Sequence, residues 1–194
     1  LIGDPTSMGD GIALNDSVCT ANINTVTMLN VTSQNIFILT GIQDFTSLSE
    51  LRCYNNNLVT LDVSANIALT YLYCYNNNLI ALDVSANNAL HYLACRNNNI
   101  ATLNVNTNLR YLICNNNLLT TLDLSANPLL IELKSYSNNL ISLDVRNGTN
   151  SIITDFNTTN NPNLTCINVD NVTYSDMYWT DIDPQQYFSI NCNI

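Results

Sequence analysis

The chain has 194 residues, of which 46% are hydrophobic and only 10% are charged, and its formal net charge is −10. Asp and Glu outnumber Lys and Arg by 15 to 5, which argues against a groove that tracks nucleic-acid phosphates and against electrostatic docking to an anionic membrane. No apolar run reaches the length of about 18 residues that a membrane span needs.

The chain begins at Leu1 rather than Met and shows no signal peptide, so we expect either a mature fragment or a piece chosen for expression. Asparagine occurs 36 times. Its side chain hydrogen-bonds the local backbone and tolerates the left-handed conformation, so this composition favours many tight turns. Residues 1–25 precede the regular pattern and contain Cys19, for which the sequence suggests no partner.

A repeat built from two similar halves starts at Leu48, and both halves follow the pattern LxxLx[CLV]xxN. Spacings of 21, 21, 19, 21 and 22 residues separate the starts of successive units, which are Leu48, Leu69, Leu90, Leu109, Leu130 and, degenerately, Ile152. The spacing of 19 arises because Asn108 is followed directly by Leu109, with the loss of two loop residues. A half-unit of about ten residues leaves room for a short strand and a turn, but not for a full helix.

The alternation of apolar residues predicts strands with one buried face near residues 50–54, 71–75, 92–96, 111–115 and 132–136. Asparagines at two fixed registers are expected to satisfy turn amides at the corners of each coil. They are Asn56, Asn77, Asn98, Asn117 and Asn138 in the first half, and Asn66, Asn87, Asn108 and Asn127 in the second. Each coil buries its apolar stripe only against its neighbours, so the array needs caps at its ends.

These units resemble the leucine-rich repeat family, specifically the nested 21-residue class of bacterial surface proteins with the consensus LxxLxCxxNxLxxLDxSxN. The match covers about residues 48–145, residues 26–45 resemble the first repeat of internalins, and residues 161–192 resemble a C-terminal cap of Bacteroidetes-type secreted proteins. Asp155 and Asn157 stand where Leu and Cys are expected, so we expect that coil to fray.

The resemblance implies a β-rich solenoid: a right-handed leucine-rich-repeat coil with parallel sheets, almost no helix, and about seven coils plus caps. The implied divisions are a partial N-terminal cap at 1–25, the solenoid at 26–160 and a C-terminal cap at 161–194.

Four of the seven cysteines share one inward position in the repeat, namely Cys53, Cys74, Cys95 and Cys114. Stacked coils place them along a line at intervals of about 4.7–4.9 Å, which cannot surround a tetrahedral zinc ion. Their parallel side-chain directions disfavour disulfides, so we predict free, buried thiols. Cys166 and Cys192 flank a repeat-free segment and are predicted to form a disulfide in the cap, which implies an oxidising compartment.

Catalysis finds little support in the sequence. His91, the only histidine, occupies a repeat position where other coils have Ser49, Thr70 and Arg110, which is typical of a variable surface site. No nucleophile elbow, HExxH motif or Gly-rich phosphate loop is present. Polysaccharide-cleaving β-helices also carry asparagine ladders, but they build clefts from long loops that these short turns lack. We therefore predict neither an enzyme nor a cofactor.

The outward positions of the first half carry seven of the ten tyrosines and four of the five basic residues. Tyr and Arg are enriched at interface hot spots, and Tyr rings also stack on sugars. The alternative is that cross-strand aromatic pairs only stabilise the sheet. The candidate binding residues are Arg52, Tyr54, Tyr71, Tyr73, Tyr75, His91, Tyr92, Arg96, Arg110, Tyr111, Lys134 and Tyr136.

The outward positions of the second half carry a column of aspartates, which are Asp62, Asp83, Asp123 and Asp144, with Asn104 and Asn106 exposed in the short coil. Calcium could bridge Asp62 with Asp83 and Asp123 with Asp144, because it accepts carboxylate oxygens in flexible geometry. Alternatively, each carboxylate caps a local turn amide.

Two functions are compatible with this pattern. The first is an extracellular or outer-cell-surface recognition and adhesion module that binds a glycan, with an acidic polysaccharide favoured, or a protein. The second is a structural spacer in a larger surface protein, for which seven coils would span about 30 Å. In both cases we expect a monomer that inserts into no membrane and binds no nucleic acid.

Overall fold

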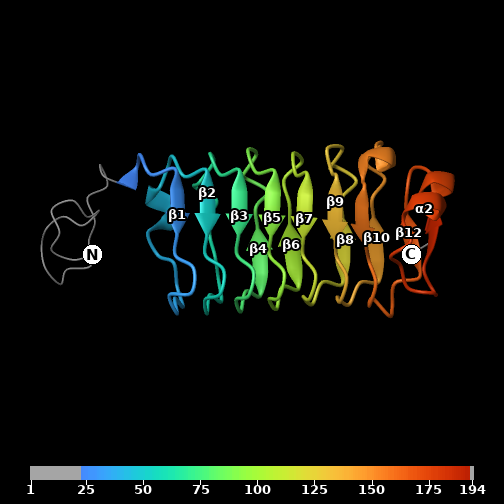
Figure 1. Ribbon diagram of the computed structural model, residues 1–194, viewed down its shortest axis with the longest axis horizontal. Helices are drawn as coiled ribbons and strands as arrows, with labels where there is room; N and C mark the ends of the chain where they lie inside the picture. Colours follow the sequence, from blue (N-terminus) through green and yellow to red (C-terminus); the bar gives the residue numbers. More distant parts are fainter. Residues whose placement is uncertain (1–22, 193–194) are drawn as a thin grey trace, which may run out of the picture.

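The computed structural model describes residues 23–192. Cys19 and most of the expected N-terminal cap lie outside these residues. The chain winds into about eight turns that are stacked along one long axis (Figure 1), which confirms the predicted β-solenoid. Within the described range, no helix is both long and apolar enough to cross a membrane.

One side of the solenoid is a continuous parallel sheet of seven strands in the order β1-β2-β3-β5-β7-β9-β11. The strands are β1 (Met28–Asn30), β2 (Glu50–Arg52), β3 (Tyr71–Tyr73), β5 (Tyr92–Ala94), β7 (Tyr111–Ile113), β9 (Glu132–Lys134) and β11 (Asp155–Asn157). Each strand has three residues, two fewer than the predicted ranges, because the chain leaves the regular strand at the inward Cys and bends at the left-handed residue two positions later. Backbone pairing still extends past the strand, since Cys53 N donates to Tyr73 O at 2.9 Å.

The other side of the solenoid is divided into two separate sheets. The first pairs β4 (Ala81–Asp83) with β6 (Thr102–Asn104), and the second contains β8 (Thr121–Asp123), β10 (Ser142–Asp144), β12 (Cys166–Asn168) and β13 (Tyr187–Ser189). Residues 60–62 form no strand. The break between β6 and β8 lies at the coil that is two residues short, whereas nothing in the sequence marks the missing strand at 60–62, because residues 61–66 and 82–87 are identical.

Leucines and cysteines from every coil fill the space between the two sides. Cys53, Cys74, Cys95 and Cys114 are completely buried and free, as predicted, and Ser135 and Thr158 continue their column. Burial raises the pKa of Cys95 to about 12, so its thiol stays protonated and behaves as a small apolar group. Cys166 and Cys192 form the predicted disulfide, with their Cα atoms 5.8 Å apart.

Buried asparagines at the corner after each inward Cys hold adjacent coils together, as the sequence predicted. Asn77 is typical: its Oδ1 accepts from Leu58 N at 3.0 Å, and its Nδ2 donates to Cys53 O and Cys74 O at 3.0 and 3.1 Å. The preceding Asn76 has a φ of 54°, which asparagine tolerates better than most residues. Two residues of this Asn triplet therefore have separate roles: Asn76 makes the left-handed turn, and the side chain of Asn77 bonds backbone groups of its own and the preceding coil.

Two predictions about register are wrong. In the short coil, the second asparagine column passes through Asn106, which is 2% exposed, and not through Asn108, which is half-buried. The loop that lost two residues shifts the turn, so Asn127 Nδ2 donates to Asn106 O at 2.6 Å. Asn106 is therefore not part of the exposed column either.

The last coil of the continuous sheet does not fray. Its unit begins at Ile153, one residue later than predicted, and Ile153 is completely buried. With this shift, Phe156 pairs with Leu133 in the sheet and faces the core. Asp155 and Asn157 then fall on outward positions, where polar residues are ordinary.

Between residues 23 and 192, helical structure is limited to short segments. The 3-10 helices η1 (Ile42–Asp44) and η2 (Asn150–Ile152) lie at turns, and α2 (Val172–Tyr178) lies near the C-terminus. Asn171 caps α2, because its side chain accepts from Tyr174 N. Trp179 follows the helix, stacks on Phe156 with centroids 4.1 Å apart, and donates from Nε1 to Ile153 O. These aromatic contacts cover the C-terminal end of the hydrophobic core.

Candidate binding surface

Tyrosine rings cover the middle of the continuous sheet. Tyr71, Tyr92 and Tyr111 are the first residues of β3, β5 and β7 and lie side by side in register. Tyr92 is central: its ring centroid lies 6.3 Å from that of Tyr71, 5.1 Å from Tyr73 and 5.7 Å from Tyr111. Strand pairing thus joins four rings from three coils into one aromatic patch.

A second stack lies just beyond the strands, where the chain turns. Tyr54 and Tyr75 stack with centroids 4.4 Å apart and an angle of 10° between their planes. The guanidinium carbon of Arg96 lies 4.0 Å from the Tyr75 ring centre, and that of Arg52 lies 5.6 Å from the Tyr73 ring centre. These distances are within the range of cation–π interactions, so Arg52 is held against a ring of the aromatic patch and Arg96 against the second stack.

The four cations of this surface are not equally available to a ligand. Arg52 pairs with Glu50, and Lys134 pairs with both Glu132 and Asp155 at 2.8 Å. Arg96 and Arg110 take part in none of the salt bridges of residues 23–192. The unmatched positive charge of the surface is therefore concentrated at Arg96 and Arg110.

Partial burial affects the phenol groups of the patch. Burial raises the pKa values of Tyr73, Tyr75 and Tyr92 above the usual value, and neighbouring Glu50, Tyr54 and Tyr73, respectively, raise them further. All three hydroxyl groups are therefore neutral at physiological pH. They can donate hydrogen bonds to an acceptor while their rings offer apolar contact.

The predicted binding residues do not form one uninterrupted group. Ala94 and Ile113 occupy outward positions between the tyrosines and Lys134, yet they are 0% and 9% exposed. Asn115, which separates Arg96 from Tyr136 in its column, is also buried. Tyr136 and Lys134 thus lie apart from the aromatic patch, while His91 is half-buried directly before β5.

The carboxylates that neutralise Arg52 and Lys134 were missed by sequence reasoning. The signal was present, because Glu50 precedes Arg52 by two residues and Glu132 precedes Lys134 by two. Residues two apart in a strand share a face and can meet.

The aspartates of the opposite side cap their own turns. Oδ1 of Asp62, Asp83, Asp123 and Asp144 each accepts the backbone amide two residues further on, at 2.9–3.0 Å. Hydrogen bonds from Ser64 and Ser85 lower the pKa values of Asp62 and Asp83. Asp144 also pairs with Arg146. Within residues 23–192, no group of three or more His, Cys, Asp or Glu side chains is placed to hold a metal ion.

Solved structures with a similar fold come from Listeria monocytogenes. The functional domain of InlJ, which includes a cysteine ladder, is 36% identical with a TM-score of 0.62, over 78% of this chain and 32% of that one. The internalin InlF is 18% identical with a TM-score of 0.60, over 90% of this chain and 50% of that one, and shows the fold alone. The chain thus spans a third to a half of these proteins. No protein-family model and no curated protein matches it.

Proposed function

From this internalin-like leucine-rich-repeat fold, we propose that the chain is a non-catalytic recognition and adhesion module of the nested 21-residue class. It acts at the extracellular or outer surface of a bacterial cell, with a partial cap before residue 26 and a C-terminal cap after residue 160. The functional domain of InlJ is similar to this chain, and leucine-rich-repeat solenoids commonly bind partners through an exposed sheet face. The disulfide between Cys166 and Cys192 supports an oxidising location.

The Tyr/Arg surface is the proposed ligand site, and its centre consists of Tyr71, Tyr73, Tyr75, Tyr92 and Arg96. The carrying observation is that Arg96 stacks at 4.0 Å on Tyr75 while no carboxylate neutralises it within the described residues. A guanidinium held in this way binds carboxylates or sulfates in bidentate fashion. Tyrosine rings beside it provide flat contact area for a sugar ring or an apolar side chain.

The proposed ligand is an acidic polysaccharide or an acidic loop of a protein. The net charge of −10 opposes the approach of such a ligand from a distance. Affinity must therefore arise at contact range, from the arrangement of the rings and Arg96. Arg52 and Lys134 contribute less, because each already has a carboxylate partner.

A glycan array that contains uronic-acid and sulfated oligosaccharides tests this proposal directly. We expect selective binding of acidic glycans by the isolated domain as a monomer, and loss of this binding in the variant Tyr73→Ala/Tyr92→Ala. If neither glycans nor surface proteins bind, the alternative of a structural spacer replaces this proposal.

A further inference from the structure

Carboxylates border the aromatic row of the Tyr/Arg surface along the solenoid axis. The row consists of Tyr71, Tyr92 and Tyr111, which pair in register. The same pairing extends it to Glu50 on one side and to Glu132 and Asp155 on the other. Arg52 already pairs with Glu50, and Lys134 is a single cation between two carboxylates. An acidic ligand lying along the axis would therefore meet no unmatched positive charge of the described residues at either end of the row.

The two unmatched cations of the surface lie on opposite edges of the same row. Arg110 directly precedes β7, and Arg96 lies two residues beyond the end of β5. The two coils stay paired over this stretch, because Arg110 N donates to His91 O at 2.9 Å and, further on, Asn97 N donates to Asn115 O at 3.0 Å. This pairing places Arg96 beside Asn115, five residues after Arg110. The two cations are therefore about 16 Å apart along the strand direction.

The strip between these cations is flat. Ala94 and Ile113 face outward in its middle, yet both are buried. Rings lie close around them, since the centroid of Tyr92 lies 5.1 Å from that of Tyr73 and 5.7 Å from that of Tyr111. An extended peptide places alternate side chains in pockets, whereas this strip offers ring faces. Flat sugar rings therefore fit it better than a peptide does.

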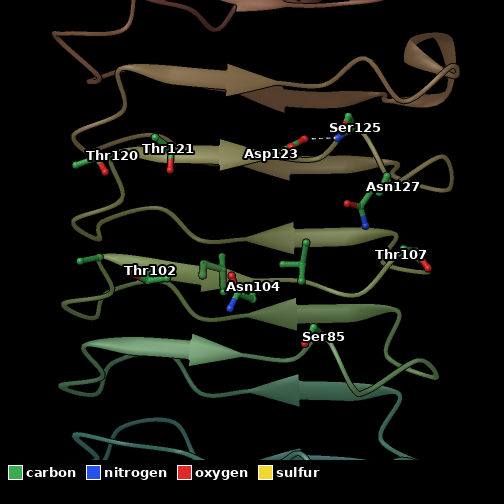
Figure 2. A pocket seen from close by; sticks show the side chains of 13 residues that line it. Ser85, Thr102, Asn104, Thr107, Thr120, Thr121, Asp123, Ser125 and Asn127 are labelled. Carbon is green, nitrogen blue, oxygen red and sulfur yellow. Dashed lines mark hydrogen bonds between the residues drawn. The ribbon is translucent and has the colours of Figure 1, made fainter.

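The opposite side of the solenoid offers no comparable place for an acidic ligand. Its hollow of about 550 Å³ lies beside β6 and β8 and is lined mainly by hydroxyl, amide and small apolar groups. None of the described residues that line it is basic, and Figure 2 shows Asp123 among them. A carboxylate or sulfate would be repelled there.

We propose that the ligand of the Tyr/Arg surface is a linear acidic polysaccharide that crosses the solenoid parallel to the strands instead of following its axis. One carboxylate or sulfate binds Arg96 and a second binds Arg110. The sugars between them stack on Tyr92 and Tyr111. A sugar residue lengthens an extended glycan by roughly the rise of one coil, so the two anionic groups belong to sugars about three residues apart. This inference rests on the proposed function and adds the direction and the minimum length of the ligand.

Oligogalacturonates of two, four and six residues are the probes, because every sugar of these chains bears one carboxylate. In calorimetry, we expect the tetramer to bind about tenfold more tightly than the dimer, which reaches only one cation. Arg96→Gln and Arg110→Gln should each weaken the tetramer about tenfold but the dimer only about twofold, because the dimer can bind at the other cation. Arg146→Gln, on the opposite side, is the control and should leave both affinities unchanged.

A nitroxide label at the reducing end of the hexamer tests the direction of the ligand. If the glycan crosses the solenoid, the label should broaden backbone amide NMR signals near Arg110 or Arg96 and leave β2 and β9 unchanged. Broadening at β2 or β9, or equal affinities of the dimer and the tetramer, would overturn the crossing, although the Tyr/Arg surface would remain the binding site.

A matched peptide tests the class of ligand. The capped peptide Glu-Gly-Gly-Gly-Gly-Glu carries two carboxylates five residues apart but no rings, and we expect it to bind more weakly than the tetramer. Equal or tighter binding of the peptide would overturn the choice of a polysaccharide and leave the proposed site intact. If neither the peptide nor any oligogalacturonate binds, the proposed site is wrong as well.

Discussion

The guanidinium carbon of Arg96 lies 4.0 Å from the centre of the Tyr75 ring, although 21 residues separate the two in the chain. Tyr75 stacks in turn on Tyr54 of the preceding coil. Three consecutive coils therefore cooperate to orient one cation on a surface of aromatic rings. Because no carboxylate of the described residues pairs with Arg96, its N–H groups stay available to a carboxylate or sulfate of a ligand.

Replacing Arg96 should weaken the binding of an acidic ligand. We expect Arg96→Ala to lower affinity for a uronic-acid oligosaccharide about tenfold, and Arg96→Lys to restore only part of it, since lysine keeps the charge but loses the bidentate geometry. Arg146→Ala, on the opposite side, serves as the control and should bind normally in calorimetry. If Arg96→Ala binds the oligosaccharide with unchanged affinity, Arg96 does not belong to the binding site.

Removing one corner asparagine should strongly destabilise the solenoid. Asn77→Ala leaves Leu58 N without a partner and removes one of two asparagine donors from Cys53 O and from Cys74 O, which keep Asn56 and Asn98, at a cost of about 3 kcal/mol. The exposed neighbour Asn78 provides the control, and Asn78→Ala should change stability by less than about 0.5 kcal/mol. Urea denaturation measures both. Similar midpoints for the two variants would contradict the role of the buried column.

The thiols of the cysteine column should be inert in the folded protein. Burial raises the pKa of Cys53 to about 12 and leaves no path for a reagent, and the thiolate is the reactive form. We expect Cys53, Cys74, Cys95 and Cys114 to react with a thiol reagent only after denaturation. Without reduction, the denatured chain should then show five free groups, these four and Cys19. A count of one would mean that the column is cross-linked.

Calcium should not stabilise the aspartate side. Each carboxylate already accepts a turn amide, and Asp83 Oδ2 also accepts from Asn104 Nδ2 at 3.1 Å. Thermal melts with excess calcium and with chelator should therefore superpose. A site filled at a hundred times its dissociation constant would add about 2.7 kcal/mol and shift the midpoint visibly. Such a shift would instead support calcium ions that bridge Asp62 with Asp83 or Asp123 with Asp144.

The repeat made most of the fold predictable, because inward Leu, Cys and Asn recur at fixed spacing and each has one physical role. The disulfide was predictable because Cys166 and Cys192 stand outside the repeat. The error at Ile153 arose where the spacing changes: Phe156 replaces an inward Leu, so a search for Leu placed the unit one residue early. Asn106 was misplaced for a similar reason, since a loop two residues shorter moves the corner.

The candidate surface was predictable only in part. Strand alternation places Tyr71, Tyr92 and Tyr111 side by side, and the structure has them there. The ion pairs of Arg52 and Lys134 depend on side-chain conformation, and the burial of Ala94 depends on the large rings around it. The gap between β6 and β8 lies at the coil that is two residues short, so the spacing marked its place, but the spacing did not predict that backbone pairing is lost there.

The binding affinities of two double variants test the central claim most directly. The ligand is the acidic oligosaccharide that the array identifies, and calorimetry measures its affinity for each protein. Tyr73→Ala/Tyr92→Ala should lose about 2 kcal/mol, roughly thirtyfold, because these rings lie at the centre of the aromatic patch. Asp83→Asn/Asp123→Asn should bind as the unaltered protein does. If the Asp variant loses the ligand while the Tyr variant keeps it, the binding site lies on the opposite side and the proposed function of the Tyr/Arg surface is wrong.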